Sequence, residues 1–249
     1  MNSLYDDADL YDLVAPGNAD MERFYVETAG GTGRRVLELG CGSGRFTVPL
    51  AASGADVTAI DISPTMLDRA RQALADKGLS ANLVELDMRD FDLDQQFDAI
   101  LIAANSLLHL HSRNDFACAL TAIRRHLAPG GVFAFDIFVP SAAMLSRAPD
   151  QRQPMGTFTH ARLGPVTVEE TIAYDPTTQI SRADWYWSTE TQKDFRHTRL
   201  DLRQIYPQEL PLLLELGGLQ LRDRFGGFDR IPMTRQSFRQ VCLAVAATE

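Results

Sequence analysis

A short apolar stretch that runs directly into closely spaced glycines constrains the fold of this chain more than any other feature. The stretch is VLELGCGSG, residues 36–44. Its first half has the composition of a buried strand, and residues 45–52 have the pattern of a helix. Glycines at this spacing let the backbone approach a ligand, because no Cβ intervenes, and a turn that opens a helix presents free N–H groups. We therefore expect a small molecule to bind across this turn.

Further apolar runs follow and alternate with helical patterns. The strand-like runs are 56–60, 82–86, 97–103 and 132–138, and the helical ones are 64–77 and 115–127. Ser63 and Pro64 are a typical cap and first residue of a helix. Asn18 likewise caps a predicted helix that ends near Ala29. Strands that are apolar throughout predict a parallel sheet covered on both faces.

The pattern changes after Pro140. Residues 158–206 alternate between strands and polar turns, which predicts an antiparallel meander. A leucine-rich helix at 208–216 and two strands at 219–225 and 240–246 then return to the main sheet. We expect a core with an N-terminal cap segment, a β lid and a C-terminal part that completes the core. Their predicted bounds are 1–140, 141–206 and 207–249.

Charge and composition restrict the location and partners. The net charge of the 249 residues is −9, and residues 151–249 are balanced, so the excess lies in residues 1–150. An acidic N-terminal part disfavours nucleic acid as a partner and suits a cationic ligand, although solubility alone would also explain it. We expect no membrane span, because no apolar run reaches about 18 residues. The acidic N-terminus without a signal-peptide pattern and the three dispersed cysteines predict a cytoplasmic protein.

Polar residues stand at the predicted strand ends, where open α/β sheets bind ligands. The glycine spacing is G-x-G-x-G, and Arg45 stands where a dinucleotide fingerprint has its third glycine. Glu38, two residues before Gly40, would repel a pyrophosphate and attract an ammonium or sulfonium group. This carboxylate turns the prediction away from dinucleotides and towards a cationic ligand.

The next two strand ends suggest an adenosine. Asp61 suits the two ribose hydroxyls, although a turn aspartate before a helix is the alternative. Asp87 suits an adenine amino group, although a loop carboxylate on the surface is the alternative. Ile62 and Met88 are apolar neighbours able to sandwich a flat base.

At this point the sequence resembles the class I S-adenosylmethionine-dependent methyltransferases. The resemblance covers roughly residues 30–140 in the order of that family, and its five motifs are VLELGCGSG (36–44), VTAIDISPTM (57–66), ELDMRDF (85–91), FDAILIAANSLLHL (97–110) and LAPGGVFAFD (127–136). It implies an α/β fold, a Rossmann-like doubly wound sheet of seven strands. That sheet is mostly parallel with the seventh strand antiparallel, and an antiparallel β lid is inserted after the fifth strand. The lid and a Tyr-Asp repeat near the N-terminus loosely resemble the sugar-amine N-methyltransferases.

The resemblance also implies the cofactor S-adenosyl-L-methionine and a role for each matching residue. The methionine moiety would meet Glu38 and the glycine turn, the ribose Asp61, and the adenine Ile62, Asp87 and Met88. The carbonyl of Ala103 or Ala104 would accept a hydrogen bond from the cofactor's amino group. The implied cofactor residues are Glu38, Gly40, Gly42, Gly44, Asp61, Ile62, Asp87, Met88 and Ala103.

Methyl transfer needs little beyond alignment of nucleophile, carbon and sulfur, so a weak catalytic signature is expected. His109 is the predicted general base, with a purely structural histidine as the alternative. Tyr11 is predicted to close over the cofactor, with packing alone as the alternative. No metal is expected, because no carboxylate cluster or histidine spacing suggests one.

The acceptor pocket is predicted from position alone. Its expected residues are Asn105, Asp136, Phe138 and Tyr186. Trp185 and Trp187 alternate with Tyr186 on the lid and either line the pocket, form the lid core or contact a second copy. The function expected is methyl transfer to a nitrogen or oxygen of a small metabolite, and the lid also offers a route to a homodimer. The alternatives are a non-methylating reaction of the cofactor, such as cyclisation that releases methylthioadenosine, or cofactor binding without catalysis.

Overall fold

The computed structural model describes residues 2–15 and 17–247, and these form two compact units. One unit comprises the chain up to residue 16 together with residues 140–204, and the other comprises residues 17–139 and 205–249. We call the first the lid unit and the second the core unit. This division differs from the expected bounds 1–140, 141–206 and 207–249, because the N-terminal segment groups with the lid strands and not with the core.

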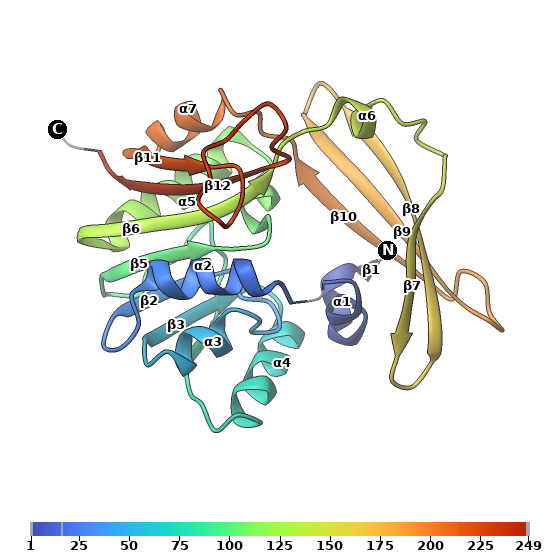
Figure 1. Ribbon diagram of the computed structural model, residues 1–249, viewed down its shortest axis with the longest axis horizontal. Coiled ribbons are helices and arrows are strands. Elements are labelled where there is room, and N and C mark those ends of the chain that lie inside the picture. Colours follow the sequence, from blue (N-terminus) through green and yellow to red (C-terminus); the bar gives the residue numbers. More distant parts are fainter. Residues whose placement is uncertain (1, 16, 248–249) are drawn as a thin grey trace. The chain divides into compact units, whose positions relative to one another are not determined.

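The core unit is built on a seven-stranded sheet in the order β11-β12-β6-β5-β2-β3-β4 (Figure 1). Its strands are β2 (Arg35–Leu39), β3 (Asp56–Asp61), β4 (Asn82–Glu85), β5 (Phe97–Ile102), β6 (Leu127–Phe138), β11 (Leu219–Phe225) and β12 (Arg239–Ala246). Strands β4, β3, β2, β5 and β6 are parallel, whereas β12 runs antiparallel between β6 and β11. The predicted seven-stranded sheet with one antiparallel strand is confirmed.

Helices cover both faces of this sheet, as the apolar strands predict. The helices of the core unit are α2 (Ala19–Ala29), α3 (Thr47–Ala52), α4 (Pro64–Ala75), α5 (Arg113–His126) and α7 (Leu210–Glu215), with a short 3-10 helix η2 (Ser106–His109). Helices α2, α3 and α4 share one apolar cluster with the sheet. Figure 1 shows α2 and α3 on the near face of the sheet and α5 behind it, where α5 contacts α7.

Local sequence signals determine where these helices begin. The side chain of Asn18 accepts hydrogen bonds from two backbone N–H groups at the start of α2, and Ser63 caps α4 with Pro64 in its first turn. Both predicted caps are confirmed. Helix α5 begins at Arg113, two residues earlier than predicted, because Ser112 forms a capping box with Asp115. Strand β6 begins at Leu127, five residues before the predicted start at residue 132, so it includes the glycine-containing segment 128–131.

The lid unit contains a five-stranded sheet in the order β1-β10-β9-β8-β7. Its elements are β1 (Asn2–Ser3), the 3-10 helix η1 (Leu4–Asp6), α1 (Ala8–Val14), α6 (Ala142–Leu145), β7 (Gln153–His160), β8 (Gly164–Asp175), β9 (Ile180–Thr189) and β10 (Arg196–Arg203). Strands β7 to β10 form the predicted antiparallel meander, and β1 adds to β10 in parallel. This added strand attaches the N-terminal segment to the lid sheet.

An apolar cluster explains why the N-terminal segment stays with this sheet. Leu4 and Leu10 are buried together with Trp187 and two valines of β8. Trp187 donates a hydrogen bond from Nε1 to Thr198 Oγ1 (2.9 Å), and Trp185 packs against it with ring centroids 6.2 Å apart. Of the three roles considered for the tryptophans, the structure supports that of the lid core. None of the helices between residues 2 and 247 that the structure describes is long and apolar enough to cross a membrane.

Candidate functional site

Four parallel strands of the core unit end at one edge of the sheet, and the predicted cofactor residues lie at these ends. Strands β3 and β5 flank β2, so the strand order reverses beside the glycine turn. Ligands of open α/β sheets bind at such a switch point. The sequence therefore places Glu38, Asp61, Asp87 and Ala103 at neighbouring strand ends.

The glycine turn requires glycine for its backbone conformation and its packing. Gly40, Gly42 and Gly44 have φ values of 68°, 55° and 86°, a left-handed region that other residues rarely adopt. A Cβ on Gly44 would lie 3.0 Å from the Cβ of Ala70 on α4. A Cβ on Gly40 would lie 3.4 Å from the Cε of Met88 and the Cβ of Ser106. The turn is thus a cradle whose walls come from the segments that follow β4 and β5 and from α4.

Glu38 is a buried carboxylate directly before this turn. It is 1% exposed, and its Oε2 accepts a hydrogen bond of 2.6 Å from the hydroxyl of Thr47, the first residue of α3. Burial raises the pKa of Glu38 to about 8, against the hydrogen bond from Thr47, and the charge of Asp61 adds to the rise. A cationic group bound here would favour the ionised carboxylate. Sequence reasoning missed Thr47, since its only signal is its place one helical turn beyond the glycines.

Asp61 connects the end of β3 to the glycine turn. Its Oδ2 accepts from the backbone N–H of Gly42 (2.7 Å), and its Oδ1 accepts from that of Ser63 (2.9 Å). Burial raises the pKa of Asp61, and the two backbone hydrogen bonds act in the opposite direction. The next residue, Ile62, is 64% exposed, which is unusual for a large apolar side chain at a strand end. This pair offers an acceptor for hydroxyls beside an uncovered apolar surface.

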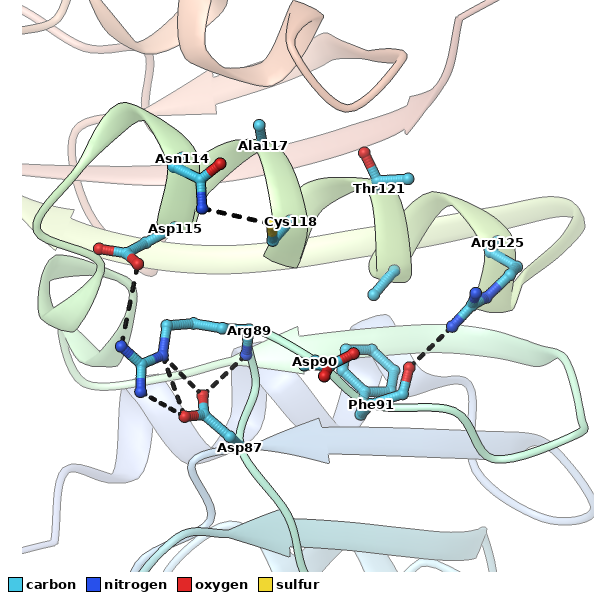
Figure 2. A pocket seen from close by; sticks show the side chains of 11 residues that line it. Asp87, Arg89, Asp90, Phe91, Asn114, Asp115, Ala117, Cys118, Thr121 and Arg125 are labelled. Carbon is cyan, nitrogen blue, oxygen red and sulfur yellow. Dashed lines mark hydrogen bonds and ion pairs between the residues drawn. The ribbon is translucent and has the colours of Figure 1, made fainter.

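Asp87 already has a side-chain partner in this structure. Arg89 donates to both carboxylate oxygens from Nε (3.0 Å each), and this pairing holds the pKa of Asp87 below its usual range. Figure 2 shows Arg89 between Asp87 and Asp115, where its Nη1 lies 3.8 Å from Asp115 Oδ1. The pair lines an open groove between the segment after β4 and helix α5, with Cys118 on the helix side. An adenine amino group at Asp87 would share the carboxylate with Arg89.

The turn after β5 has an unusual backbone. Ala104 and Asn105 both have left-handed φ values, 56° and 66°, although neither is glycine. The carbonyl of Ala103 accepts from the N–H of Ser106 (3.1 Å), and Ser106 opens helix η2. The side chain of Asn105 accepts from the N–H of Phe138 on β6 (2.8 Å). Asn105 was predicted for the acceptor pocket, but its side-chain oxygen here fixes the turn to the neighbouring strand.

Asp136, which was predicted to face an acceptor pocket, is held by other groups of the core unit in this structure. Its side chain is fully buried and accepts hydrogen bonds from the hydroxyl of Tyr25 (2.6 Å), the N–H of Ala104 (2.8 Å) and the guanidinium of Arg239 (2.5 Å). The alternation along β6 turns residue 136 towards α2, which carries Tyr25. Burial raises the pKa of Asp136, while the charge of Arg239 lowers it.

The other residues predicted for the catalytic and acceptor sites lie on η2, β6, α1 and β9. His109 is the half-buried last residue of η2, and Phe138 is half-buried at the end of β6. Tyr11 lies on α1 of the lid unit, with its ring 5.6 Å from that of Tyr5. Tyr186 lies on the face of the lid sheet opposite to the tryptophans, where it stacks on His197 (4.8 Å, 2°).

We found no metal centre in the described part of the chain. Within residues 2–15 and 17–247, no three His, Cys, Asp or Glu side chains are grouped so that they could hold an ion.

The residues that surround Asp136 were also missed by sequence reasoning, since Tyr25 and Arg239 are distant in the chain and carry no motif.

Comparison with known proteins agrees with the geometry of the core unit. Residues 36–131 match the family described as methyltransferase domain. The cypemycin N-terminal methyltransferase of a Streptomyces species is 34% identical over 145 residues, which cover 56% of this chain and 58% of that protein. The dTDP-3-amino-3,4,6-trideoxy-alpha-D-glucopyranose N,N-dimethyltransferase of Streptomyces venezuelae is 30% identical over 142 residues, 53% of this chain and 56% of that protein. The matches thus span little more than half the length of these curated relatives.

A solved structure extends the likeness beyond this domain. The CcbJ methyltransferase from Streptomyces caelestis is 28% identical, with a TM-score of 0.84 over 99% of both chains. The likeness therefore includes the lid unit as well as the core unit. Taken with the glycine turn and the polar strand ends, these matches identify residues 36–131 as a methyltransferase domain of the class I fold, whose cofactor is S-adenosylmethionine.

Proposed function

We propose that this protein transfers a methyl group from S-adenosylmethionine to a nitrogen or oxygen atom of a small metabolite. The observation that carries the proposal is the buried carboxylate of Glu38 beside the glycine turn, with Asp61 bonded to the same turn. This arrangement suits a ligand that carries a cationic amino acid moiety and a ribose.

The described residues fit this cofactor. Gly40 has no Cβ, and a Cβ there would occupy space next to Met88 and Ser106 that a ligand could use. The side chain of Ile62 is exposed at the edge where the adenine would lie. We assign the amino acid moiety to Glu38 and the glycine turn, and the ribose to Asp61. The adenine is assigned to Ile62, Met88 and Asp87. The carbonyl of Ala103 has a second lone pair beyond its bond from Ser106, which leaves it able to accept from an ammonium group.

The cofactor supplies a methyl group bonded to a positively charged sulfur. The contribution of the protein is then chiefly to hold the acceptor in line with that bond. His109 is our candidate for removing a proton from the acceptor, since it follows the β5 turn that adjoins the cofactor residues. Tyr11 on α1 is the second candidate for a contact with the reacting groups.

The class of acceptor is inferred from the relatives and from the lid unit. The two curated relatives are described as methylating an amino sugar nucleotide and the N-terminus of cypemycin, so a nitrogen acceptor is favoured over oxygen. The lid unit, with Tyr186, is the part of the chain where we place acceptor contacts and a homodimer interface.

All three cysteines are free, which supports a reducing compartment such as the cytoplasm. The net charge of −9, with its excess in residues 1–150, supports a metabolite partner over nucleic acid.

The test is to incubate the protein with S-adenosylmethionine and a panel of primary amines, amino sugars and hydroxylated metabolites. Mass spectrometry then follows S-adenosylhomocysteine and the acceptor mass. We expect S-adenosylhomocysteine to form in step with a gain of one methyl group on an amine. Methylthioadenosine from S-adenosylmethionine alone would instead support intramolecular cyclisation. Tight cofactor binding with no product from any acceptor of the panel would contradict the small-metabolite proposal.

A further inference from the structure

The buried carboxylate of Asp136 links strand β6 to the turn that follows β5. We infer that Asp136 is a positioning residue of the cofactor site, which holds the turn Ala104–Asn105 in its left-handed conformation and thereby orients the carbonyl of Ala103. The inference rests on the proposed function, because it assigns that carbonyl to the amino group of the cofactor.

The turn that follows β5 has a strained backbone. Two successive non-glycine residues with φ values of 56° and 66° are unfavourable, and alanine tolerates this region less well than asparagine. Such a conformation persists only where the surrounding structure imposes it. A strained turn beside a predicted ligand site is therefore a candidate for a functional role.

Two hydrogen bonds to β6 impose this conformation. The N–H of Ala104 donates to Asp136 Oδ1 (2.8 Å), and the side chain of Asn105 accepts from the N–H of Phe138 (2.8 Å). Both partners lie on β6, two residues apart on a strand that pairs with β5 and β12. The turn is thus fixed at two successive residues by one strand of the sheet.

Asp136 is itself held in place by two further side chains. Its Oδ1 also accepts from the hydroxyl of Tyr25 (2.6 Å), and its Oδ2 accepts from Arg239 on β12 (2.5 Å). Asp136 and Tyr25 are both fully buried. A carboxylate fixed from α2 and from β12 is a rigid anchor for the N–H of Ala104.

The turn after β5 adjoins the glycine turn through Ser106. Ser106, whose N–H is bonded to the carbonyl of Ala103, has its Cβ 3.4 Å from where a Cβ on Gly40 would lie. A rotation of the Ala103–Ala104 peptide would turn this carbonyl away and displace Ser106 from the glycine turn. Loss of the anchor should therefore weaken cofactor binding even though the side chain of Asp136 is fully buried.

The experiment compares four proteins by the dissociation constant of S-adenosylhomocysteine and by the melting temperature. Asp136→Ala should weaken binding roughly tenfold or more and lower the melting temperature. Tyr25→Phe removes a hydrogen bond from the same carboxylate but leaves the bond to Ala104. It should lower the melting temperature and change the dissociation constant less than about threefold.

The double variant Asp136→Ala with Ala104→Gly distinguishes positioning from general stability. Glycine adopts the left-handed conformation without the anchor, so the dissociation constant should return to within about threefold of the original while the melting temperature stays low. Equal loss of affinity in the single and double variants would overturn the inference, as would unchanged affinity in Asp136→Ala. If Asp136→Ala does not fold, the milder Asp136→Asn is compared with and without Ala104→Gly by the same criteria. Failure of the unaltered protein to bind would instead count against the proposed function.

Discussion

The hydroxyl of Thr47 on α3 donates a hydrogen bond of 2.6 Å to the carboxylate of Glu38 on β2, inside the core unit. The pair places a carboxylate of pKa about 8 beside a glycine turn, where a cationic ligand is expected. Near neutral pH this carboxylate holds a proton in the free protein, and a bound ammonium group would favour its loss. The consequences for stability and for binding can be measured separately.

Replacing Glu38 by glutamine should change the pH dependence of folding stability. The folded pKa of about 8 lies above the usual value of 4.5, so the native state binds more protons than the unfolded chain between these values. Stability contributed by the neutral carboxyl is full below pH 4.5 and is lost as the pH rises through 8. Glu38→Gln does not titrate, so it should match the unaltered protein at pH 5 and exceed it by roughly 2–4 kcal/mol at pH 9. Urea unfolding of both proteins at both pH values measures their free energies of unfolding. If the two proteins differ by the same free energy at pH 5 and at pH 9, the burial of an ionisable carboxyl at position 38 is refuted.

Cofactor binding should release a proton near pH 7. Glu38 is mostly protonated there in the free protein and becomes ionised beside a bound ammonium group. Calorimetric titration with S-adenosylhomocysteine in two buffers of different ionisation enthalpy reports the number of protons released. We expect a release approaching one proton for the unaltered protein and near zero for Glu38→Gln. The same release from both proteins would show that another group titrates.

Removing the carboxylate of Asp61 should abolish most of the cofactor affinity. This residue is assigned to the ribose, and it also holds the N–H of Gly42 at 2.7 Å. We expect Asp61→Ala to raise the dissociation constant at least thirtyfold, about 2 kcal/mol. The matched control is Asp68→Ala on α4, whose carboxylate is exposed and pairs only with Arg71 among the contacts described. If both variants bind alike, the ribose assignment is wrong.

Glycine substitutions separate backbone strain from close packing in the turn. Gly44 and Gly33 have similar φ values of 86° and 76°, but a Cβ would meet Ala70 at 3.0 Å only at Gly44 and would meet nothing within 4 Å at Gly33. Gly33→Ala should cost about 1 kcal/mol of folding stability, and Gly44→Ala about 1–3 kcal/mol more. Chemical denaturation of both variants gives the difference, and equal losses would mean that α4 yields to the added methyl group.

Much of the core could be predicted because its signals are local. The glycine turn, the caps Asn18 and Ser63 and the order of the apolar runs each depend on residues near in the chain, and together they define the doubly wound sheet. Contacts of long sequence separation could not be predicted. The orientation of Asp136 depends on Tyr25 and Arg239, each more than 100 residues away.

Two differences between the expected and the observed arrangement have the same origin. The N-terminal segment was assigned to the core because its own sequence carries no sign of the pairing between β1 and β10. Asp136 was assigned to the acceptor pocket because alternation along β6 does not reveal which face of that strand meets α2. Arg89 and Asp87 are only two residues apart, so their opposite charges are a local signal for the pairing that the structure shows.

The most direct test of the account is calorimetric titration of the unaltered protein with S-adenosylhomocysteine. We predict saturable binding at one site per chain, with an affinity that Asp61→Ala removes and Asp68→Ala retains. Absence of binding heat and of any rise in melting temperature at millimolar ligand would contradict the assignment of Glu38, the glycine turn and Asp61 to this cofactor.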